Sequence, residues 1–405
     1  MIANSNPIRK RIVVKIEAKL ATPALIGSGN HEHTDNDVLV NRNGEPYLSG
    51  ATLAGVLRSK LSDHDGNILF GEDSTGDGKM SALWVVDAKF KEAKIIELDG
   101  VALDYENKVA ISKAKYDFEA VECGAKFTIR MMLVIRKEDD EVMMEKTFTT
   151  ILARISSGDI SVGAKSNRGF GCISCQSEDI KIQTFDYQTE KRAALIRYEA
   201  FNWEDSDNWT NYVIKKFDDE DSVMSKTLRL KGSIMIRDTR HLDCDEDYKH
   251  ICSENGVPVI YGTTWAGAFK GSLYKLLKPR FGEKTEDYLN GYFGYVDEKT
   301  KETLPSKIRF NMSTLEIEDK VYDGYRTITR VKINRFTGGA VDGALFTERP
   351  WYGGKTTLTI HYPKGCPEIE RLLNLGFDAL DKGLLTIGGE TAIGRGVFEV
   401  IQEGK

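Results

Sequence analysis

Hydrophobic and charged residues alternate along several stretches of the chain, and this alternation predicts β-strands. Between residues 11 and 20, Ile12, Val14, Ile16 and Ala18 alternate with charged residues at all positions except Val13, which is typical of a strand with one buried face. Comparable patterns predict further strands at residues 82–90, 126–136, 227–236, 355–362 and 397–401, and a last strand of the first half that runs to about residue 182.

Capping residues and longer apolar periods predict the helices. Ser49 is expected to cap a helix that runs to about Leu61. Further helices are expected at residues 141–155, 263–277 and 367–382. Both halves then follow the order β-α-β-β-α-β. This order predicts an α+β fold of two ferredoxin-like (RRM-like) domains in tandem, with inserted loops.

One sequence segment occurs twice. Residues 43–55 (NGEPYLSGATLAG) return as residues 255–267 (NGVPVIYGTTWAG), with a constant offset of 212 residues. Phe70-Gly71 is answered by Phe293-Gly294. Because a repeat of this length is a duplicated domain rather than a solenoid unit, two related domains are expected. We expect a first domain at residues 1–190, an acidic connection with aromatic residues at 191–225, and a second domain at 226–405.

Composition is that of a globular protein. The 405 residues are 40% hydrophobic and 29% charged, and this length suffices for two cores. No apolar run approaches the roughly 20 residues of a membrane helix. Six cysteines in a chain of this size do not suggest a disulfide framework, so a cytoplasmic location is expected. The net charge of −6 argues against a wholly basic surface but permits a local basic groove.

A glycine-rich loop precedes the last predicted strand of each half. The loops, at residues 163–171 and 387–396, align here on Arg168-Gly169 and Arg395-Gly396. Their glycines would let backbone amides approach phosphates while Lys165 and Arg168 neutralise charge. The alternative is that the glycines only permit tight turns with positive φ.

Other basic residues are candidates for binding a phosphate backbone without sequence preference. The alternative for helical positions is a solvated amphipathic face. The candidates are Arg58, Lys60 and Lys270 on the first helix of each half, and Arg330, Lys332 and Arg335 in a basic run on a predicted strand.

Three motifs together give the chain a family resemblance. They are the glycine-rich loops, a Pro-x-x-x-Gly-Thr-x-x-x-Gly helix start at Pro258, and a Phe-Gly…Ser…Asp-Ala segment at Phe70, Ser81 and Asp87. With them the chain resembles the RAMP proteins of CRISPR systems, and in particular the backbone subunits of type III effector complexes. Those subunits coat the guide RNA and cut the target RNA. Residues 330–337 and 343–348 are similar to the central region of that family.

The resemblance implies that an aspartate in the loop after the first strand carries cleavage. The matching residues are Asp35, eleven residues before Pro46, and Asp247, eleven residues before Pro258. One carboxylate can position a hydrated Mg²⁺ or another divalent cation, or accept a proton from an attacking 2′-hydroxyl. The alternative is that both aspartates only solubilise their loops. Neighbouring histidines are possible auxiliary acids or bases: His31 and His33 in the first loop, and His241 and His250 in the second.

The implied partners are a CRISPR guide RNA, a complementary target RNA and other type III effector subunits, with no membrane. Two alternatives stay open. One is a guide-processing endoribonuclease that needs no metal, and the other is a structural RNA-binding subunit whose aspartates are idle.

Overall fold

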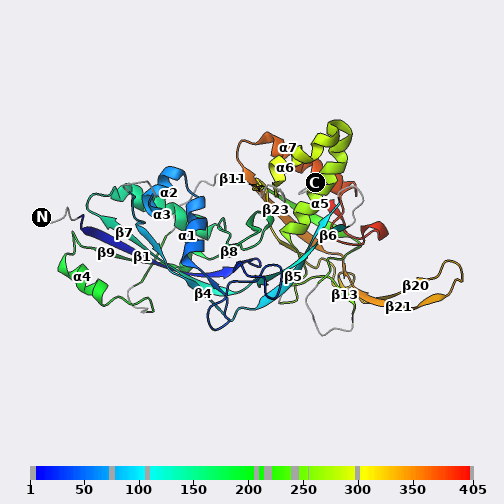
Figure 1. Cartoon of the computed structure of the whole chain (residues 1–405), viewed down its shortest axis with the longest axis horizontal. Coiled ribbons are helices and arrows are strands. Elements are labelled where there is room, and N and C mark those ends of the chain that lie inside the picture. Colours follow the sequence, from blue (N-terminus) through cyan, green and yellow to red (C-terminus); the bar gives the residue numbers. More distant parts are fainter. Residues whose placement is uncertain are drawn as a thin grey trace. The chain divides into compact units, whose positions relative to one another are not determined.

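The computed structural model describes residues 6–72, 78–104, 110–204, 209–213, 221–238, 246–253, 255–296 and 302–401. The chain divides into two compact units that mix helices and sheets (Figure 1). Unit 1 contains Met1–Ile96, Glu119–Ala164 and Gly171–Asp218. Unit 2 contains Glu97–Phe118, Lys165–Phe170 and Asp219–Lys405.

Unit 1 is built on a sheet whose central strand is β1 (Ile8–Leu20). Strand β1 pairs antiparallel with β7 (Lys126–Arg136) on one side and with β9 (Ile180–Asp186) on the other. The sheet order is β10-β9-β1-β7-β4-β2, with β3 on β7 and β8 on β1. The smaller strands are β2 (Tyr47–Leu48), β3 (Leu83–Val85), β4 (Ala88–Lys91), β8 (Ile173–Ser174) and β10 (Thr210–Asn211).

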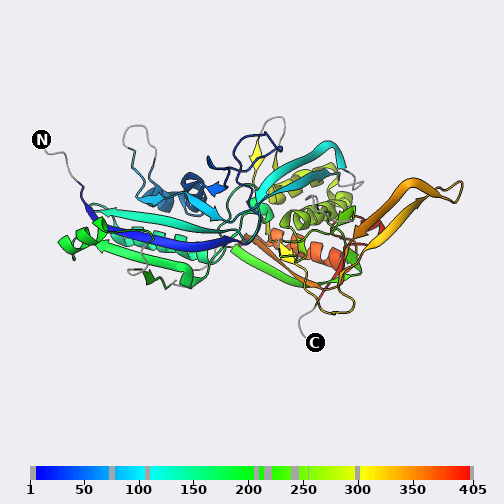
Figure 2. The ribbon, with the colours of Figure 1, turned by 90° about the horizontal axis from the view of Figure 1, so that it is seen from below.

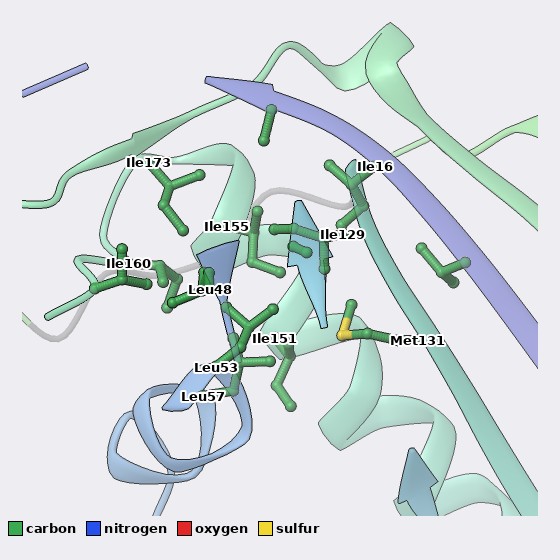
Figure 3. Packing of buried hydrophobic residues seen from close by; sticks show 14 of the residues in the cluster. Ile16, Leu48, Leu53, Leu57, Ile129, Met131, Ile151, Ile155, Ile160 and Ile173 are labelled. Carbon is green, nitrogen blue, oxygen red and sulfur yellow. The ribbon is translucent and has the colours of Figure 1, made fainter. Parts of the chain in front are cut away.

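Alternation along β1 places neighbouring side chains on opposite faces of this sheet. Val14 and Ile16 join the main core with α1 (Gly50–Ser59), α2 (Asp63–Phe70) and α3 (Glu141–Ser156). Figure 3 shows Ile16 in this core with residues of α1 and α3. Val13 instead packs with Ala194 of α4 (Arg192–Glu199) on the other face. Since full burial of one such aliphatic side chain stabilises by about 1.5–3 kcal/mol, the alternating pattern fixes which face each helix covers.

The expected connection partly packs down onto unit 1. Trp203 and Trp209 join Phe185 of β9 in an aromatic cluster beside α4. The guanidinium of Arg11 lies 4.2 Å from the ring centroid of Tyr198. Most acidic residues of the expected connection lie outside the described residues.

Unit 2 contains a four-stranded sheet of β11 (Asp221–Lys231), β17 (Arg309–Phe310), β23 (Lys355–Pro363) and β24 (Val397–Val400), in the order β17-β23-β11-β24. Its core is closed by α5 (Gly262–Phe281), α6 (Thr285–Phe293) and α7 (Pro367–Asp381). The first strand of each repeat has equivalent neighbours. β1 lies between β7, which precedes α3, and β9, which follows the first glycine-rich loop. β11 lies between β23, which precedes α7, and β24, which follows the second glycine-rich loop.

Each repeat also carries a long hairpin. The first is β5 (Ile95–Leu103) with β6 (Ala110–Val121), and the second is β20 (Ile328–Ile333) with β21 (Ala340–Arg349), which projects away from the helices of unit 2 (Figure 2). The remaining short strands are β12 (Ser233–Ile234), β13 (Tyr248–Lys249), β14 (Val259–Ile260), β15 (Tyr295–Val296), β16 (Thr303–Leu304), β18 (Ser313–Thr314), β19 (Gly324–Tyr325) and β22 (Trp351–Tyr352).

The first helix of each repeat begins where a strand passes very close. A Cβ atom on Gly50 would lie 2.4 Å from the carbonyl oxygen of Val85, and one on Gly262 would lie 2.1 Å from that of Phe310. Only glycine fits at such distances. As predicted, Ser49 caps α1, because its hydroxyl accepts a hydrogen bond from the N–H of Thr52 at 3.1 Å.

Several predicted boundaries were wrong. The strand expected at 82–90 is broken between β3 and β4, where the Asp87 carboxylate accepts a hydrogen bond from the N–H of Gly50 at 2.7 Å. The strand expected up to residue 182 is two strands, β8 and β9, because a short 3-10 turn separates them. The strand expected at 227–236 ends at Lys231, and α5 continues to Phe281. The short helices α2 and α6 were not predicted, since each is too brief to show a helical period.

Candidate functional site

The loop that carries Asp35 is held in one conformation by its neighbour Asp37. The buried Asp37 carboxylate accepts hydrogen bonds from the backbone N–H groups of Thr34 at 2.8 Å and Glu32 at 2.6 Å, and from the Thr34 hydroxyl at 3.0 Å. These bonds, with the Thr34 N–H contributing most, lower the pKa of Asp37 to about 2. Asp37 is therefore the anchor of the loop.

The ends of the loop are fixed as well. The N–H of Val38 donates to the Glu119 carboxylate at 2.8 Å, and the N–H of Glu119 donates to the carbonyl of Asn36 at 3.0 Å. Asp35 lies between these anchors with an exposed side chain, and its carbonyl contacts Nδ1 of His31. His31 and His33 are also exposed. The loop thus presents the Asp35 carboxylate and two imidazoles to solvent on an anchored backbone, with Glu32 as a second exposed carboxylate.

The second repeat has the same backbone frame at Asp247. In the first repeat, Ser28 N–H donates to the Asp37 carbonyl at 2.9 Å; in the second, Asp238 N–H donates to the Lys249 carbonyl at 2.9 Å. The next rung is also shared, because Leu39 N–H bonds the Ile26 carbonyl and Ile251 N–H bonds the Ile236 carbonyl. These rungs make Lys249 the equivalent of Asp37. Asp247 is therefore the structural equivalent of Asp35, as the offset of 212 residues indicates.

The surroundings of Asp247 differ from those of Asp35. Asp247 is exposed, but its Oδ2 accepts a hydrogen bond from the N–H of Thr347 on β21 at 2.7 Å. His250 is fully buried, and its Nδ1 accepts from the N–H of Ile236 at 3.1 Å. Burial lowers the pKa of His250 to about 3, so this imidazole is neutral and belongs to the core. His241 lies outside the described residues.

A divalent cation would find few protein ligands at either aspartate. No cluster of three or more His, Cys, Asp or Glu side chains suited to a metal occurs within the described parts of the chain. The oxygens of Asp37 are occupied by the bonds to residues 32–34. The site thus suits only an ion that keeps most of its coordinated water or takes oxygen ligands from a substrate. Mg²⁺ commonly binds in this way.

Two of the predicted RNA-binding residues, Arg58 and Lys270, make equivalent contacts, each within its own repeat. Arg58 donates to the carbonyl of Gly71 at 3.0 Å and to the Asn67 side chain at 2.6 Å, at the end of α2. Lys270, at the equivalent position, donates to the Asn290 side chain at 2.7 Å and to the carbonyl of Gly294 at 3.4 Å, at the end of α6. Cations at these carbonyl ends stabilise the short helices. The Phe-Gly motif of each repeat is thus the end of a short helix, and the cation of that repeat binds the carbonyl group of its glycine.

Lys60 also has an internal partner. Its Nζ lies 2.9 Å from the Asp159 carboxylate, which pairs with the buried Arg154 at 2.7 Å. This pairing could not be predicted from local patterns, because Asp159 is 99 residues away.

The two glycine-rich loops share one backbone, with a different alignment from the predicted one. Lys165 and Glu390 both adopt the left-handed conformation, with φ of 58° and 57°. A Cβ on Gly171 would lie 1.8 Å from the Val162 carbonyl oxygen, and one on Gly396 would lie 1.8 Å from the Ile387 carbonyl oxygen. Gly396 therefore matches Gly171. The alignment of Arg168-Gly169 with Arg395-Gly396 was wrong by two residues, and Arg395 corresponds to Phe170.

The side chains of the first glycine-rich loop have distinct environments within unit 2. Nζ of Lys165 lies 3.2 Å from the ring centroid of Phe118 and 4.6 Å from that of Tyr116. Burial, with a smaller contribution from Arg168, lowers the pKa of Lys165 to about 7. Arg168 is exposed. Gly169 is buried, and a Cβ there would lie 2.4 Å from the Phe310 carbonyl oxygen, so this glycine serves close packing.

In the second loop, charged groups take over the buried positions. Arg395 is only 2% exposed and pairs with the fully buried Glu348 and, at 3.3 Å, with Glu390. Arg330 also pairs with Glu348, at 2.7 Å. Because Arg395 is buried in these ion pairs, its role in this conformation is structural. Gly396, the next residue, forms the tight turn.

The β20–β21 hairpin presents the remaining predicted basic residues. Lys332 and Arg335 are exposed. Phe336 at the tip is 99% exposed, and Ile333 and Leu345 are also exposed. Phe336 was not among the predicted RNA-binding residues, although an aromatic residue directly after Arg335 was visible in the sequence.

The repeat also appears in comparison with known proteins. A family model of the RAMP superfamily matches residues 17–174 and again residues 241–399. The chain belongs to the RAMP superfamily. This RAMP protein matches no curated protein. Membership indicates a CRISPR-associated RNA-binding subunit, with CRISPR RNA and an effector complex as its partners. None of the described helices has both the length and the apolar character to cross a membrane.

Proposed function

We propose that this RAMP protein is a guide-RNA-binding backbone subunit of a type III CRISPR effector complex, and that it cleaves complementary target RNA at one site in each repeat. The observation that carries the proposal is the shared hydrogen-bond frame of Asp35 and Asp247. Each frame presents an exposed carboxylate at the same step of the loop after the first strand. A duplicated surface of this kind suits a subunit that makes two cuts.

The strand order supports a ferredoxin-like topology for both repeats. The orders β9-β1-β7-β4 and β24-β11-β23-β17 both place the first strand between the third and the fourth, counting the main strands along each repeat. The neighbouring strands are antiparallel. This is the order that β-α-β-β-α-β units adopt when both crossovers are right-handed.

Guide binding would depend on exposed cations together with aromatic surface. Arg168, Lys332 and Arg335 are exposed, and Phe336 offers a ring at the tip of the hairpin. Cations hold a phosphate backbone without reading sequence, and rings stack on any base. This combination suits a protein that must accept every guide.

For cleavage, we propose that the target 2′-hydroxyl attacks the adjacent phosphate. The rigid Asp35 carboxylate accepts the hydroxyl proton or orients water near the scissile phosphate. His31 or His33 donates a proton to the leaving 5′-oxygen. A bound Mg²⁺ would neutralise charge on the phosphate. Because one carboxylate supplies little binding energy, the RNA must be held bent for in-line attack by the guide-binding surface.

The second repeat has a competing structural role. The Thr347 N–H bond to the Asp247 carboxylate ties β21 to the loop, and this contact alone could account for the residue. The guide-processing alternative, which uses histidine without metal, is disfavoured in this repeat because His250 is buried and neutral.

The test is cleavage of a labelled, guide-complementary RNA by the assembled complex with Mg²⁺. Asp35→Ala and Asp247→Ala should each remove one product and slow that cut by about 100-fold or more, the range for loss of an acid–base group. Glu32→Ala is the matched control, since it removes an exposed carboxylate from the same loop. Chelation by EDTA should stop both cuts.

Unchanged products in Asp35→Ala, Asp247→Ala and the double variant would leave the chain as a structural subunit. Loss of the Asp35-dependent product alone would restrict cleavage to the first repeat. Cleavage that survives EDTA but depends on His31 or His33 would favour the metal-independent alternative.

A further inference from the structure

The first helices of the two repeats differ in length, although they start at equivalent glycines. Helix α1 has 10 residues, whereas α5 has 20. The extra turns of α5 and the short link to α6 carry four cations: Lys275, Lys278, Arg280 and Lys284. The first repeat has no counterpart for this extension, so a function that both repeats share does not explain it.

Aromatic rings follow the same extension. Phe281 stacks on Tyr288, with ring centroids 5.0 Å apart and planes 12° apart, and Tyr288 contacts Tyr292 edge to face at 5.4 Å. The guanidinium carbon of Arg280 lies 5.5 Å from the Phe281 ring centroid. Phe281 is 37% exposed, so part of this stack faces solvent.

A shallow, open hollow lies on one face of α5. Its volume is about 440 Å³, and it is lined by Tyr274, Lys275, Lys278 and Pro279. Tyr274 and Lys278 are four residues apart and therefore neighbours on the helix surface, with the Lys278 amine 5.4 Å from the Tyr274 ring centroid. The hollow is thus lined by one aromatic ring and two lysines.

Carboxylates are also present nearby. Glu283, Glu286 and Asp287 follow the extension and are exposed, and Glu283 and Glu286 help to raise the pKa of Tyr274, after the larger effect of burial. Asp104 has a further, smaller effect on the pKa of Tyr274, so four carboxylates match the four cations in number. The cations that line the hollow itself are Lys275 and Lys278.

We propose that the α5 extension, from Tyr274 to Tyr288, is a binding platform for single-stranded RNA that only the second repeat possesses. A ring stack beside lysines takes bases on the rings and phosphates on the amines, without sequence preference. The inference rests on the proposed RNA-binding function and adds a second contact surface to it. It gives the two repeats unequal tasks: both hold paired RNA, and the second also holds an unpaired segment.

The test uses the purified full-length chain and a labelled 12-nucleotide oligouridine, with fluorescence anisotropy over a salt series. Lys275→Ala with Lys278→Ala should weaken binding about tenfold at low salt and reduce the salt slope by about 1.4, as expected for two phosphate contacts on a single strand. Phe281→Leu should weaken binding about tenfold through loss of stacking, whereas Phe281→Tyr should restore it. Lys382→Ala removes an exposed lysine elsewhere in unit 2 and is the control.

Target cleavage by the assembled complex is measured in parallel, so that failure of this proposal can be distinguished from failure of the proposed function. Oligouridine affinity that is unchanged in all the variants, with normal cleavage, would overturn the platform alone. An oligouridine that does not bind wild type would overturn it as well. Variants that keep RNA affinity but lose an acidic protein subunit of the complex would assign the surface to that partner instead.

Discussion

The two glycine-rich loops have the same backbone conformation, but their side chains make different contacts. Lys165 and Glu390 take the same left-handed position, but Lys165 lies on aromatic rings while Glu390 pairs with Arg395. Phe118 and Glu348 are also equivalent. Each lies three residues before a residue that pairs with the segment just after the first strand of its repeat, in the pairs Val121–Ala24 and Trp351–Ile234. One loop therefore closes on rings and the other on ion pairs.

This difference separates what the backbone requires from what the side chains do. Glycines at equivalent turns are fixed by carbonyl groups that approach too closely for any Cβ. The side chains between them have diverged completely, because burial can be satisfied by either aromatic contact or paired charge. A glycine-rich loop in this protein is thus first a turn, and only its exposed side chains, such as Arg168, are free to vary in function.

The largest effect is expected where the two loops are the same. Gly171→Ala and Gly396→Ala each place a Cβ 1.8 Å from a carbonyl oxygen at positive φ, and should cost more than about 3 kcal/mol of unfolding free energy. Gly394→Ala has similar φ but open space around the new Cβ, and should cost only about 1 kcal/mol. Chemical denaturation measures all three. Equal costs would show that φ rather than close approach decides.

The next effect breaks the loops where they differ. Glu348→Phe alone leaves the buried Arg395 guanidinium without its main partner and should cost about 3–5 kcal/mol. Adding Arg395→Phe recreates the ring pair of Phe118 and Phe170, which lie 6.0 Å apart, and should recover part of that loss. A double variant less stable than Glu348→Phe would show that the second loop cannot accept the aromatic arrangement of the first.

A third contrast concerns the residue after each anchored loop, which is Val38 in the first repeat and His250 in the second. Because the folded pKa of His250 is about 3, below its ordinary value of 6.5, its stabilising effect is present above pH 6.5 and is lost as the pH falls toward 3. At pH 4.5, two pH units below the ordinary pKa, the loss should be about 3 kcal/mol, since each pKa unit corresponds to about 1.4 kcal/mol. His250→Val should flatten this acid dependence in thermal unfolding between pH 7 and 4.5. An unchanged slope would mean that other groups control it.

The smallest effect should come from Lys165. Its pKa of about 7 means that the amine is charged below pH 7 and neutral above it, so affinity for an RNA phosphate should fall severalfold between pH 6 and 8. Lys165→Arg should remove this pH dependence, because arginine stays charged. Anisotropy of a labelled RNA over this pH range measures it. A pH dependence that persists in Lys165→Arg would assign the titration to another group.

Local patterns in the sequence determined much of the fold. Strand β7 and helix α3 match their predicted ranges closely, because each is long and strongly periodic. The constant offset of 212 residues predicted the equivalence of Asp35 and Asp247, and the two hydrogen-bond frames agree with it. The resemblance to RAMP proteins was likewise readable from motif order, and the family match confirms it.

Only the tertiary structure decided which basic residues face solvent. In sequence, Arg58, Lys60 and Lys270 resemble exposed helical cations. Lys60 and Lys270 are half-buried, and although Arg58 is exposed, all three donate to partners within their own repeat, either a helix end or the Asp159 carboxylate. Arg395 appeared equivalent to Arg168, but it is buried against Glu348, 47 residues away. The reason is physical: strand and helix periods are set by neighbouring residues, whereas the partner of a long charged side chain is set by whatever distant segment folding brings within about 3 Å of it.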